Sequence, residues 1–192
     1  MTFVCFVRHG ETDWNKEGKI QGRSDIPLNR AGQEQANLVA QHLKHENWDV
    51  LAASPLQRAK KTAETIGASI GLSEIVEMAE FVERAYGDAE GLTKEEREAA
   101  FPDQKIPNRE TDEELRERGM RGLQILLQQH PGKRILVVAH GGLINAVLSA
   151  ASKGEIGTGK TRLANTSLSR LVYRENEWHI QDVNVIDHLG VK

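Results

Sequence analysis

The sequence has a single cysteine and no long apolar run. Cys5 has no second cysteine to pair with, so a disulfide framework is excluded and a reducing compartment is expected. No apolar stretch approaches the roughly 20 residues of a membrane span. The first apolar stretch stops at Arg8, and it lacks the length and the preceding basic residues of a signal peptide. We therefore expect a cytoplasmic protein without a membrane partner.

An excess of positive charge is also missing. The net charge of −3 argues against a nucleic-acid partner, because no surplus of lysine and arginine is available to displace counterions from phosphates. A basic pocket inside a mildly acidic protein would instead suit a small anionic ligand. The hydrophobic content of 39% supplies a core, and the length predicts a single domain over residues 1–192.

Strand-like and helix-like segments alternate along the chain. The alternation predicts a three-layer α/β/α fold around a mixed, mainly parallel sheet. The predicted strands are residues 3–7, 50–53, 135–139, 167–173 and 178–185, of which the last two form a hairpin. Helices are predicted after caps at Asn29, Ser54-Pro55 and Thr111, and directly after residue 139.

Residues 84–110 do not follow this alternation. They are rich in charge and poor in apolar anchors, and they lie between two well-patterned segments. A long insertion of this kind often forms a lid or a binding loop. The same composition suits a solvated surface excursion, and both interpretations stay open.

Two predicted strands, far apart in sequence, each end in His-Gly. The first runs into Arg8, His9 and Gly10, and the other into His140 and Gly141. Ligands of open α/β sheets bind at the carboxyl ends of the strands. The two motifs are therefore expected at one ligand-binding edge.

Arginines accompany both histidines at this predicted edge. Arg8 precedes His9, and Arg58 lies one turn into the helix that follows Ser54. Guanidinium groups and helix N-termini bind phosphate oxygens well. The same guanidinium groups would repel a divalent cation, and no His-x-x-x-His or Cys-x-x-Cys spacing is present, so no metal site is expected. The predicted ligand is a phosphoryl group.

Metal-free phosphoryl transfer needs a nucleophile and a general acid. Neutral imidazole attacks phosphorus directly, and nearby arginines favour the neutral form. The acid should be a carboxyl group near the phosphate. The residues alone leave four candidates open: Glu11, Glu83, Asp88 and Glu90.

Several motifs together resemble the histidine phosphatase superfamily, the phosphoglycerate-mutase-like proteins. They follow the family order along nearly the whole chain. The matching segments are Arg8–Asn15, Gln21-Gly22, Asp25–Gly32, Ser54–Ala63, Glu83–Gly91 and Ala139–Gly142. Several motifs in family order are far more specific than any one of them.

The resemblance implies a role for each matching residue. His9 would be the phosphorylated nucleophile and Glu83 the proton donor, while Arg8, Arg58 and His140 would hold the phosphoryl oxygens. The resemblance also implies a set of substrate-binding residues, namely Asn15, Gln21, Gly22, Tyr86, Lys94, Gly141 and Asn165. The substrate would be a small phosphorylated metabolite, hydrolysed without a metal or a cofactor.

Two other functions remain to be weighed. The first is a phosphoglycerate mutase, which would need 2,3-bisphosphoglycerate as cofactor: the segments Glu83–Gly87 and Gly91–Lys94 resemble the mutase branch. It is disfavoured because Ala85 stands where mutases typically have histidine, and because the segment from Lys94 to Thr111 is short. A non-catalytic protein that binds phospholigands is disfavoured by the intact pair of His9 and Glu83.

A glycine-rich segment matches a second phosphate-binding motif. Residues 154–161 fit the P-loop pattern letter for letter. A P-loop follows a strand and opens a helix, whereas here a predicted helix precedes and a predicted strand follows. We expect a surface loop without a nucleotide.

Overall fold

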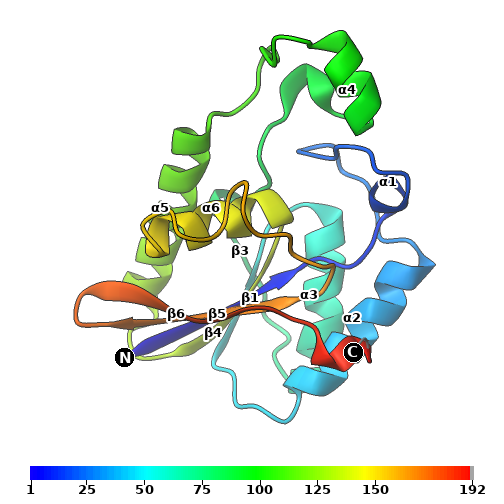
Figure 1. Cartoon of the computed structure of the whole chain (residues 1–192). Coiled ribbons are helices and arrows are strands. Elements are labelled where there is room, and N and C mark those ends of the chain that lie inside the picture. The colour runs from blue at the N-terminus through cyan, green and yellow to red at the C-terminus, as the bar shows by residue number, and fades with distance from the viewer. Residues whose placement is uncertain (191–192) are drawn as a thin grey trace.

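The computed structural model describes residues 1–190 and contains a six-stranded sheet with helices on both faces (Figure 1). In sheet order the strands are β3 (Val76–Glu77), β2 (Val50–Ala53), β4 (Arg134–Ala139), β1 (Thr2–Arg8), β5 (Leu168–Arg174) and β6 (Glu177–Val185). Pairing from β3 through β1 is parallel, and β5 and β6 add two antiparallel pairings. The predicted mixed, mainly parallel sheet is confirmed.

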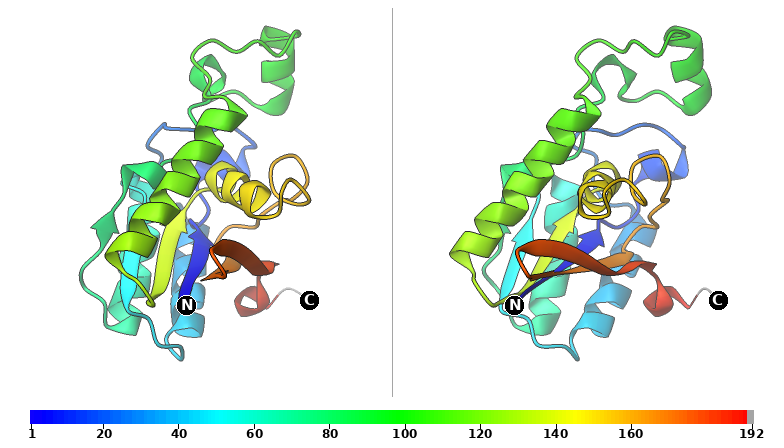
Figure 2. Two further views of the ribbon diagram at one scale, coloured as in Figure 1. Left: turned by 90° about the vertical axis from the view of Figure 1, so that its left-hand side faces the viewer. Right: turned by 60° about the vertical axis from the view of Figure 1, so that its left-hand side comes forward.

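Four long helices form the two outer layers. They are α2 (Arg30–Leu43), α3 (Gln57–Ile70), α5 (Asp112–Gln129) and α6 (Gly141–Ala151). Helices α2 and α3 pack together on one face, and α5 and α6 pack on the other, as Figure 2 shows from two further sides. The short helices are α1 (Asp13–Lys16) and α4 (Lys94–Ala100), with 3₁₀ turns at Ala79–Phe81, Gly87–Ala89 and Asp187–Leu189.

The central strand β1 is buried on both faces. Val4 and Phe6 belong to the core under α5 and α6, whereas Cys5 and Val7 belong to the core under α2 and α3. A strand covered on both sides reads as an uninterrupted apolar run, and this explains the sequence pattern. Burial raises the pKa of the Cys5 thiol to about 12, so Cys5 acts as a small core residue.

Two of the three predicted helix caps are confirmed. The Asn29 side chain accepts from the Gly32 N–H, and Thr111 forms a capping box with Glu114. The prediction that Ser54-Pro55 opens a helix is wrong. Helix α3 begins at Gln57 after Leu56, which makes no side-chain cap. The Ser54 hydroxyl accepts from the Leu56 N–H at 3.3 Å, ahead of the helix, and it also contacts His140 at the sheet edge described below.

The insertion at 84–110 is partly helical. It contains α4, which opens with a capping box between Thr93 and Glu96. That signal was present in the sequence, although the flanking region lacks apolar periodicity. Figure 2 shows α4 beyond one end of α5, displaced from the sheet. The insertion therefore extends the molecule at one end.

The late segments follow the predicted order. Strands β5 and β6 form the hairpin, and its turn residues Glu175 and Asn176 both have positive φ, as a two-residue hairpin turn requires. Residues 154–161 lie between α6 and β5, with neither a preceding strand nor a following helix, so the context excludes a P-loop. Within residues 1–190, no helix combines the length and apolar character needed to cross a membrane.

Candidate active site

Three parallel strands bring their carboxyl ends to one edge of the sheet. In the β1–β4 pairing Arg8 lies opposite Ala139, and the next N–H, that of His9, donates to the Ala139 carbonyl at 3.0 Å. On the other side of β4, the Ser54 N–H donates to the Val138 carbonyl at 3.0 Å. The register therefore places the side chains that follow β1, β2 and β4 beside one another.

His9 is held in one tautomer. Its ring is buried, and Nδ1 lies 2.7 Å from the Gly10 carbonyl. A carbonyl oxygen only accepts, so Nδ1 carries the proton and Nε2 keeps its lone pair. Burial, assisted by Arg58 and Arg8, holds the pKa of His9 well below its usual value, against the opposing effect of the Gly10 carbonyl. His9 is therefore neutral near pH 7.

Gly10 allows the loop that carries His9 to approach helix α2 closely. A Cβ at position 10 would lie 2.4 Å from the Gly32 carbonyl oxygen in the first turn of α2. The Gly10 N–H donates to Thr62 of α3 at 3.1 Å. The glycine after His9 thus lets the loop pack against two helices.

His140 lies beside His9. The two ring centroids are 5.2 Å apart, and Nε2 of His140 is 2.7 Å from the Ser54 hydroxyl. Burial lowers the pKa of His140 well below its usual value, and the charge of Arg58 adds to this effect. The two imidazoles are thus adjacent, buried and neutral.

Two arginines surround the histidines. Arg58 is fully buried and donates to the carbonyls of Gly22 and Ser24 at 2.7 and 2.8 Å, whereas Arg8 donates to the Leu163 carbonyl. Three buried nitrogens of this cluster have no partner among the described residues. They are Nε of Arg8, Nε of Arg58 and Nδ1 of His140. Buried polar nitrogens without partners are rare, and two of these three are guanidinium donors, so their grouping indicates an anion-binding site.

The Glu83 side chain also lies at this edge of the sheet, at the N-terminus of α6. Its carboxylate accepts from the N–H groups of Arg84, Gly142 and Leu143 at 2.8 to 3.0 Å, the last two at the N-terminus of α6. A Cβ at position 142 would lie 2.6 Å from a carboxylate oxygen, so a larger residue there would displace the Glu83 side chain. In the first turn of α6, Glu83 thus binds the N–H groups of Gly142 and Leu143 but not that of Gly141.

The structure separates the four candidate acids. Glu83 lines the cavity that contains His9, whereas Asp88 is exposed. Glu11 accepts from the Asn29 side chain, and Glu90 accepts from backbone and side-chain donors of Arg23, Ser24 and Tyr86. Glu90 therefore organises the loop beside the site, and Glu83 is the carboxylate in the cavity.

The cavity at this edge measures about 360 Å³. Its walls include nine of the twelve predicted site residues: Arg8, His9, Asn15, Gln21, Gly22, Arg58, Glu83, Tyr86 and Gly141. Residues 1–190 hold no cluster of three or more histidine, cysteine, aspartate or glutamate side chains suited to a metal.

Three predicted site residues lie outside the lining. His140 is fully buried, with its ring beside that of His9. Asn165 donates to the His9 carbonyl at 3.0 Å and to the Asn15 side chain at 3.2 Å, so it supports two residues that do line the cavity. Lys94 is on α4, 72% exposed, and faces Glu98 at 3.9 Å rather than the cavity.

Sequence reasoning missed several lining residues. They are Lys19, Ile20, Arg97, Gly142, Asn145, Thr161, Arg162 and Leu163. Three of them, Lys19, Arg97 and Arg162, are cations that lie outside the matching motifs. Only the tertiary structure brings these segments to the mouth of the site, so no local signal identifies them.

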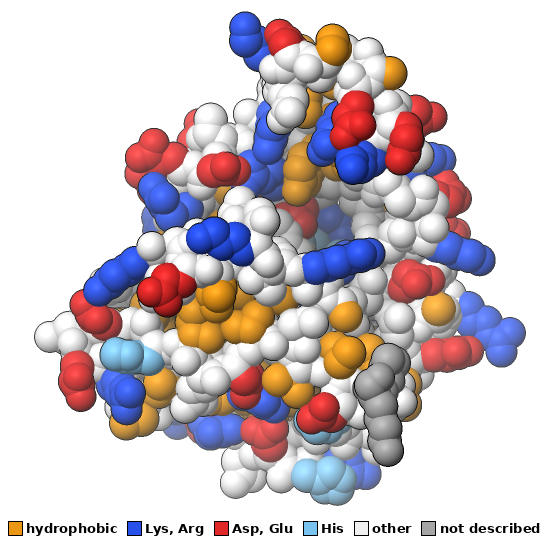
Figure 3. All heavy atoms as spheres, viewed as in Figure 1, with side chains coloured by type: hydrophobic (Ala, Val, Ile, Leu, Met, Phe, Trp, Pro, Cys, Tyr) orange, Lys and Arg blue, Asp and Glu red, His pale blue; other side chains and the backbone are white. Residues whose placement is uncertain are grey.

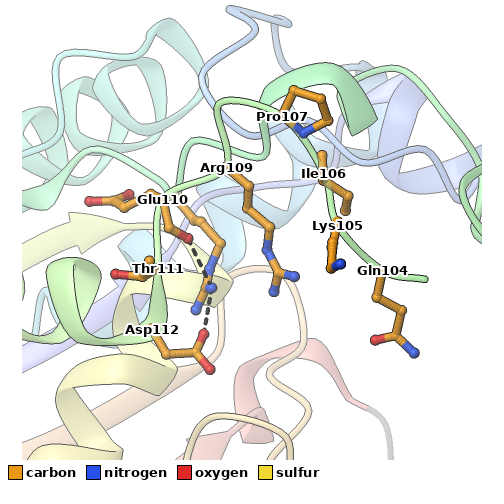
Figure 4. A pocket seen from close by; sticks show the side chains of 9 residues that line it. Gln104, Lys105, Ile106, Pro107, Arg109, Glu110, Thr111 and Asp112 are labelled. Atoms are coloured by element: carbon orange, nitrogen blue, oxygen red, sulfur yellow. Dashed lines mark hydrogen bonds and ion pairs between the residues drawn. The ribbon is translucent and has the colours of Figure 1, made fainter. Parts of the chain in front are cut away.

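A larger cavity, of about 520 Å³, lies outside this cluster (Figure 4). It is lined by Arg84 and by residues of the 104–112 segment, and it contains no histidine. The Arg84 guanidinium is paired with Asp112 and with the Glu110 carbonyl. The volume of a cavity therefore does not identify the candidate active site, whereas the buried nitrogens without partners do.

Comparison with known proteins agrees with this geometry. The profile of the histidine phosphatase superfamily (branch 1) matches residues 4–186. The chain belongs to this superfamily. It is 49% identical over 190 residues to an uncharacterized phosphatase, PhoE, of Bacillus subtilis, covering 99% of this chain and 98% of the relative. It is 33% identical to a metal-independent phosphoserine phosphatase of Arabidopsis thaliana, covering 99% of this chain and 84% of that protein.

A solved structure supports the same family assignment. Phosphoserine phosphatase of Entamoeba histolytica, in complex with 3-phosphoglyceric acid, superposes with a TM-score of 0.87 at 32% identity, covering 98% of this chain and all of the other. The fold and the enzyme class are thereby shown. This chain is an enzyme of the histidine phosphatase type.

A partly buried ion pair holds the residues on either side of Glu83 in this histidine phosphatase. Arg118 of α5 binds the Glu110 carboxylate through two nitrogens at 2.9 Å, and it donates to the carbonyls of Glu80 and Val82 at 2.8 and 2.7 Å. The Glu110 carboxylate also accepts from the Ala85 N–H at 3.1 Å. One guanidinium thus ties both sides of Glu83 to α5.

Replacing Arg118 tests this arrangement. Arg118→Ala leaves the partly buried Glu110 and the carbonyls of Glu80 and Val82 without their donor, and it should lower the free energy of unfolding by about 2 kcal/mol, within the usual range for losing a hydrogen-bonded network. Urea unfolding measures this change. Arg116→Ala, on the same helix but exposed, should change stability by less than about 0.5 kcal/mol. Equal losses of stability in the two variants would show that Arg118 does not hold the residues around Glu83 to α5.

The depressed pKa of His140 predicts a pH-dependent stability. The unfolded state takes up a proton near pH 6.5 and the folded state only well below it, so stability should fall as pH drops from about 7.5 to about 5. The slope in urea unfolding should be at most about 1.4 kcal/mol per pH unit for each such histidine. His140→Gln should flatten the slope, and His130→Gln, at a partly exposed helix end, should not. An unchanged slope in His140→Gln would contradict the buried neutral imidazole.

Proposed function

We propose that this protein hydrolyses small phosphate monoesters without a metal, through a phosphohistidine formed on His9. The observation that carries the proposal is the convergence of the three unpartnered buried nitrogens around a histidine whose Nε2 is left with its lone pair. A phosphoryl group supplies the oxygens that these donors lack. It also supplies the electrophile that a neutral imidazole attacks.

The first step transfers the phosphoryl group to the protein. Nε2 of His9 forms a bond to phosphorus while the ester P–O bond breaks. Arg8, Arg58 and His140 stabilise the charge on the phosphoryl oxygens, and they are already in place before the reaction, because backbone carbonyls and the Ser54 hydroxyl hold them. The departing alkoxide takes a proton from the Glu83 carboxyl group.

The second step returns His9 to its starting state. Water attacks phosphorus, the P–N bond breaks, and the proton of the water goes to the Glu83 carboxylate. Inorganic phosphate leaves with the oxygen that water supplied. Glu83 serves first as acid and then as base, so protons balance over the cycle. Its position at the N-terminus of α6 keeps it beside the phosphoryl group in both steps.

Metal independence follows from the same donor set. The site offers two imidazoles and one carboxylate, but the guanidinium groups of Arg8 and Arg58 lie among them and their positive charge opposes a divalent cation. The arginines supply the charge stabilisation for which other phosphatases use a metal. Activity should therefore survive EDTA.

Mutase activity is the alternative. The Glu83–Gly87 segment resembles the mutase branch, whereas Ala85 and the short segment from Lys94 to Thr111 favour hydrolysis. An assay with 2- and 3-phosphoglycerate, with and without 2,3-bisphosphoglycerate, separates the two functions. Release of inorganic phosphate without isomerisation supports the phosphatase, and cofactor-dependent isomerisation faster than hydrolysis overturns it.

Glu83→Gln tests the acid directly. An alkyl phosphate needs a proton on its leaving oxygen, whereas p-nitrophenolate leaves without one. The substitution keeps the size and removes the acid, so in pre-steady-state experiments it should slow phosphorylation by alkyl phosphates about 10²-fold more than by p-nitrophenyl phosphate.

A second carboxylate of the same loop provides the control. Asp88→Asn changes an exposed side chain that does not line the cavity, and both rates should stay within about twofold of the unmodified protein, as for an ordinary surface substitution. Equal slowing of both substrates by Glu83→Gln would show that Glu83 is not the acid.

A further inference from the structure

A turn directly before β5 contains a threonine in an unusual backbone conformation. The Ser167 N–H donates to the Ala164 carbonyl at 3.1 Å, and Thr166 within this turn has a φ of +57°. Turns that need a positive φ normally place glycine or asparagine there, because the Cβ of other residues comes close to a backbone carbonyl oxygen. Thr166 is β-branched, so its backbone is strained. Strain of this kind persists only where the surrounding contacts determine the conformation.

The turn holds the backbone of the proposed nucleophile. The Thr166 N–H donates to the carbonyls of Arg8 and His9 at 2.9 and 3.3 Å. The Asn165 side chain donates to the same His9 carbonyl at 3.0 Å. The peptide bond that follows His9 is thereby fixed, directly before the Gly10 carbonyl that selects the His9 tautomer.

Thr166 lies beneath the catalytic cavity rather than in it. Its side chain is fully buried and is not part of the cavity lining. Figure 3 shows the hollow on the outer face, with lysine and arginine side chains around it. Thr166 therefore does not contact a ligand in the cavity, and its influence on the reaction must pass through the backbone of Arg8 and His9.

The last segment of the chain supports Thr166 from the other side. Nε2 of His188, in the 3₁₀ turn Asp187–Leu189, lies 3.3 Å from the Thr166 hydroxyl. The ring of His188 also lies beside that of His42 on α2, with centroids 5.5 Å apart, and Figure 1 shows this end of the chain next to α2. Burial, assisted by the charge of His42, lowers the pKa of His188 to about 4, so its imidazole is neutral near pH 7.

A second contact joins the turn to the same end of the chain. The side-chain oxygen of Asn184, in β6, accepts from the Ala164 N–H at 2.7 Å. Asn184 also has a φ of +57°, but asparagine adopts this conformation more readily than threonine does. The turn thus lies between the last segment of the chain and the end of β1, and Thr166 is its strained residue.

We infer that Thr166 is a positioning residue for the nucleophile and that the contact with His188 holds it in its left-handed conformation. Thr166 then sets the place of the His9 backbone, and through it the approach of Nε2 to phosphorus. The inference rests on the proposed phosphatase function and adds to it a dependence on the 3₁₀ turn around His188.

The rate of phosphorylation tests the inference. With the protein in excess over p-nitrophenyl phosphate, release of p-nitrophenolate in a single turnover reports this step, and its dependence on protein concentration gives a limiting rate and an apparent Kd. His188→Leu removes the partner of the hydroxyl, and Thr166→Val removes the hydroxyl but keeps the β-branched shape. Each should lower the limiting rate about tenfold or more, as for a misplaced reacting group. The apparent Kd should change less than about twofold, because the arginines keep their carbonyl partners.

Thr166→Gly tests whether the contact acts by holding the strained conformation. Glycine adopts a positive φ without strain, so the turn no longer needs His188. The limiting rate of Thr166→Gly should stay within about threefold of the unmodified protein, and adding His188→Leu to it should cause no further loss. A further loss of about tenfold in the double variant would overturn the inference. If Thr166→Val fails to fold, His188→Leu with and without Thr166→Gly decides alone.

Matched controls separate positioning from a general loss of structure. Thr158→Val and His45→Leu change exposed residues of the same two types outside the cavity, and both should keep the limiting rate within about twofold. In protein labelled with 15N-histidine, His188→Leu should shift the ring resonances of His9 more than those of His140, which contacts Ser54 instead.

The outcomes distinguish the inference from the proposed function. Limiting rates of His188→Leu and Thr166→Val that match the two controls, or equal shifts of the His9 and His140 resonances, would overturn the positioning role while the phosphatase function stands. Failure of the unmodified protein to release p-nitrophenolate would instead contradict the proposed function.

Discussion

The burial of cationic and imidazole groups at one sheet edge is the constraint on which the rest of the site depends. Arg58 is fully buried, and within residues 1–190 three nitrogens of Arg8, Arg58 and His140 have no partner. Removing such groups from water costs free energy that a bound anion would offset. The same burial keeps both histidines neutral, so in the proposed mechanism electrophile binding and nucleophile activation have one physical origin.

The register of three parallel strands produces this burial. Strand β4 lies between β1 and β2, and its end therefore places His140 beside both His9 and Ser54. The surrounding loops then fix the details through backbone groups: the Gly10 carbonyl selects the tautomer of His9, and the α6 N-terminus holds Glu83. Small shifts of register would separate these contacts.

The sequence predicted the parts of the site that sit at strand ends or in local motifs. His9, Arg8 and Arg58 follow from such patterns, and so does the exclusion of the P-loop by its neighbours. The prediction that Ser54-Pro55 opens the next helix was wrong. The contact of the Ser54 hydroxyl with His140 depends on the pairing of β2 with β4, which the sequence does not show. The lining residues Arg97 and Arg162 were missed for a related reason: a helix and a loop from distant parts of the chain meet at the cavity only in three dimensions.

Direct observation of the covalent intermediate tests the central claim. The protein is mixed with excess substrate, quenched in base within the first turnover, digested and analysed by mass spectrometry with EDTA present throughout. Phosphate should appear on His9, labile to acid and stable to base, and it should be absent in His9→Gln, which should also lose hydrolysis. Phosphorylation of any other residue, or hydrolysis that continues in His9→Gln, would contradict the account.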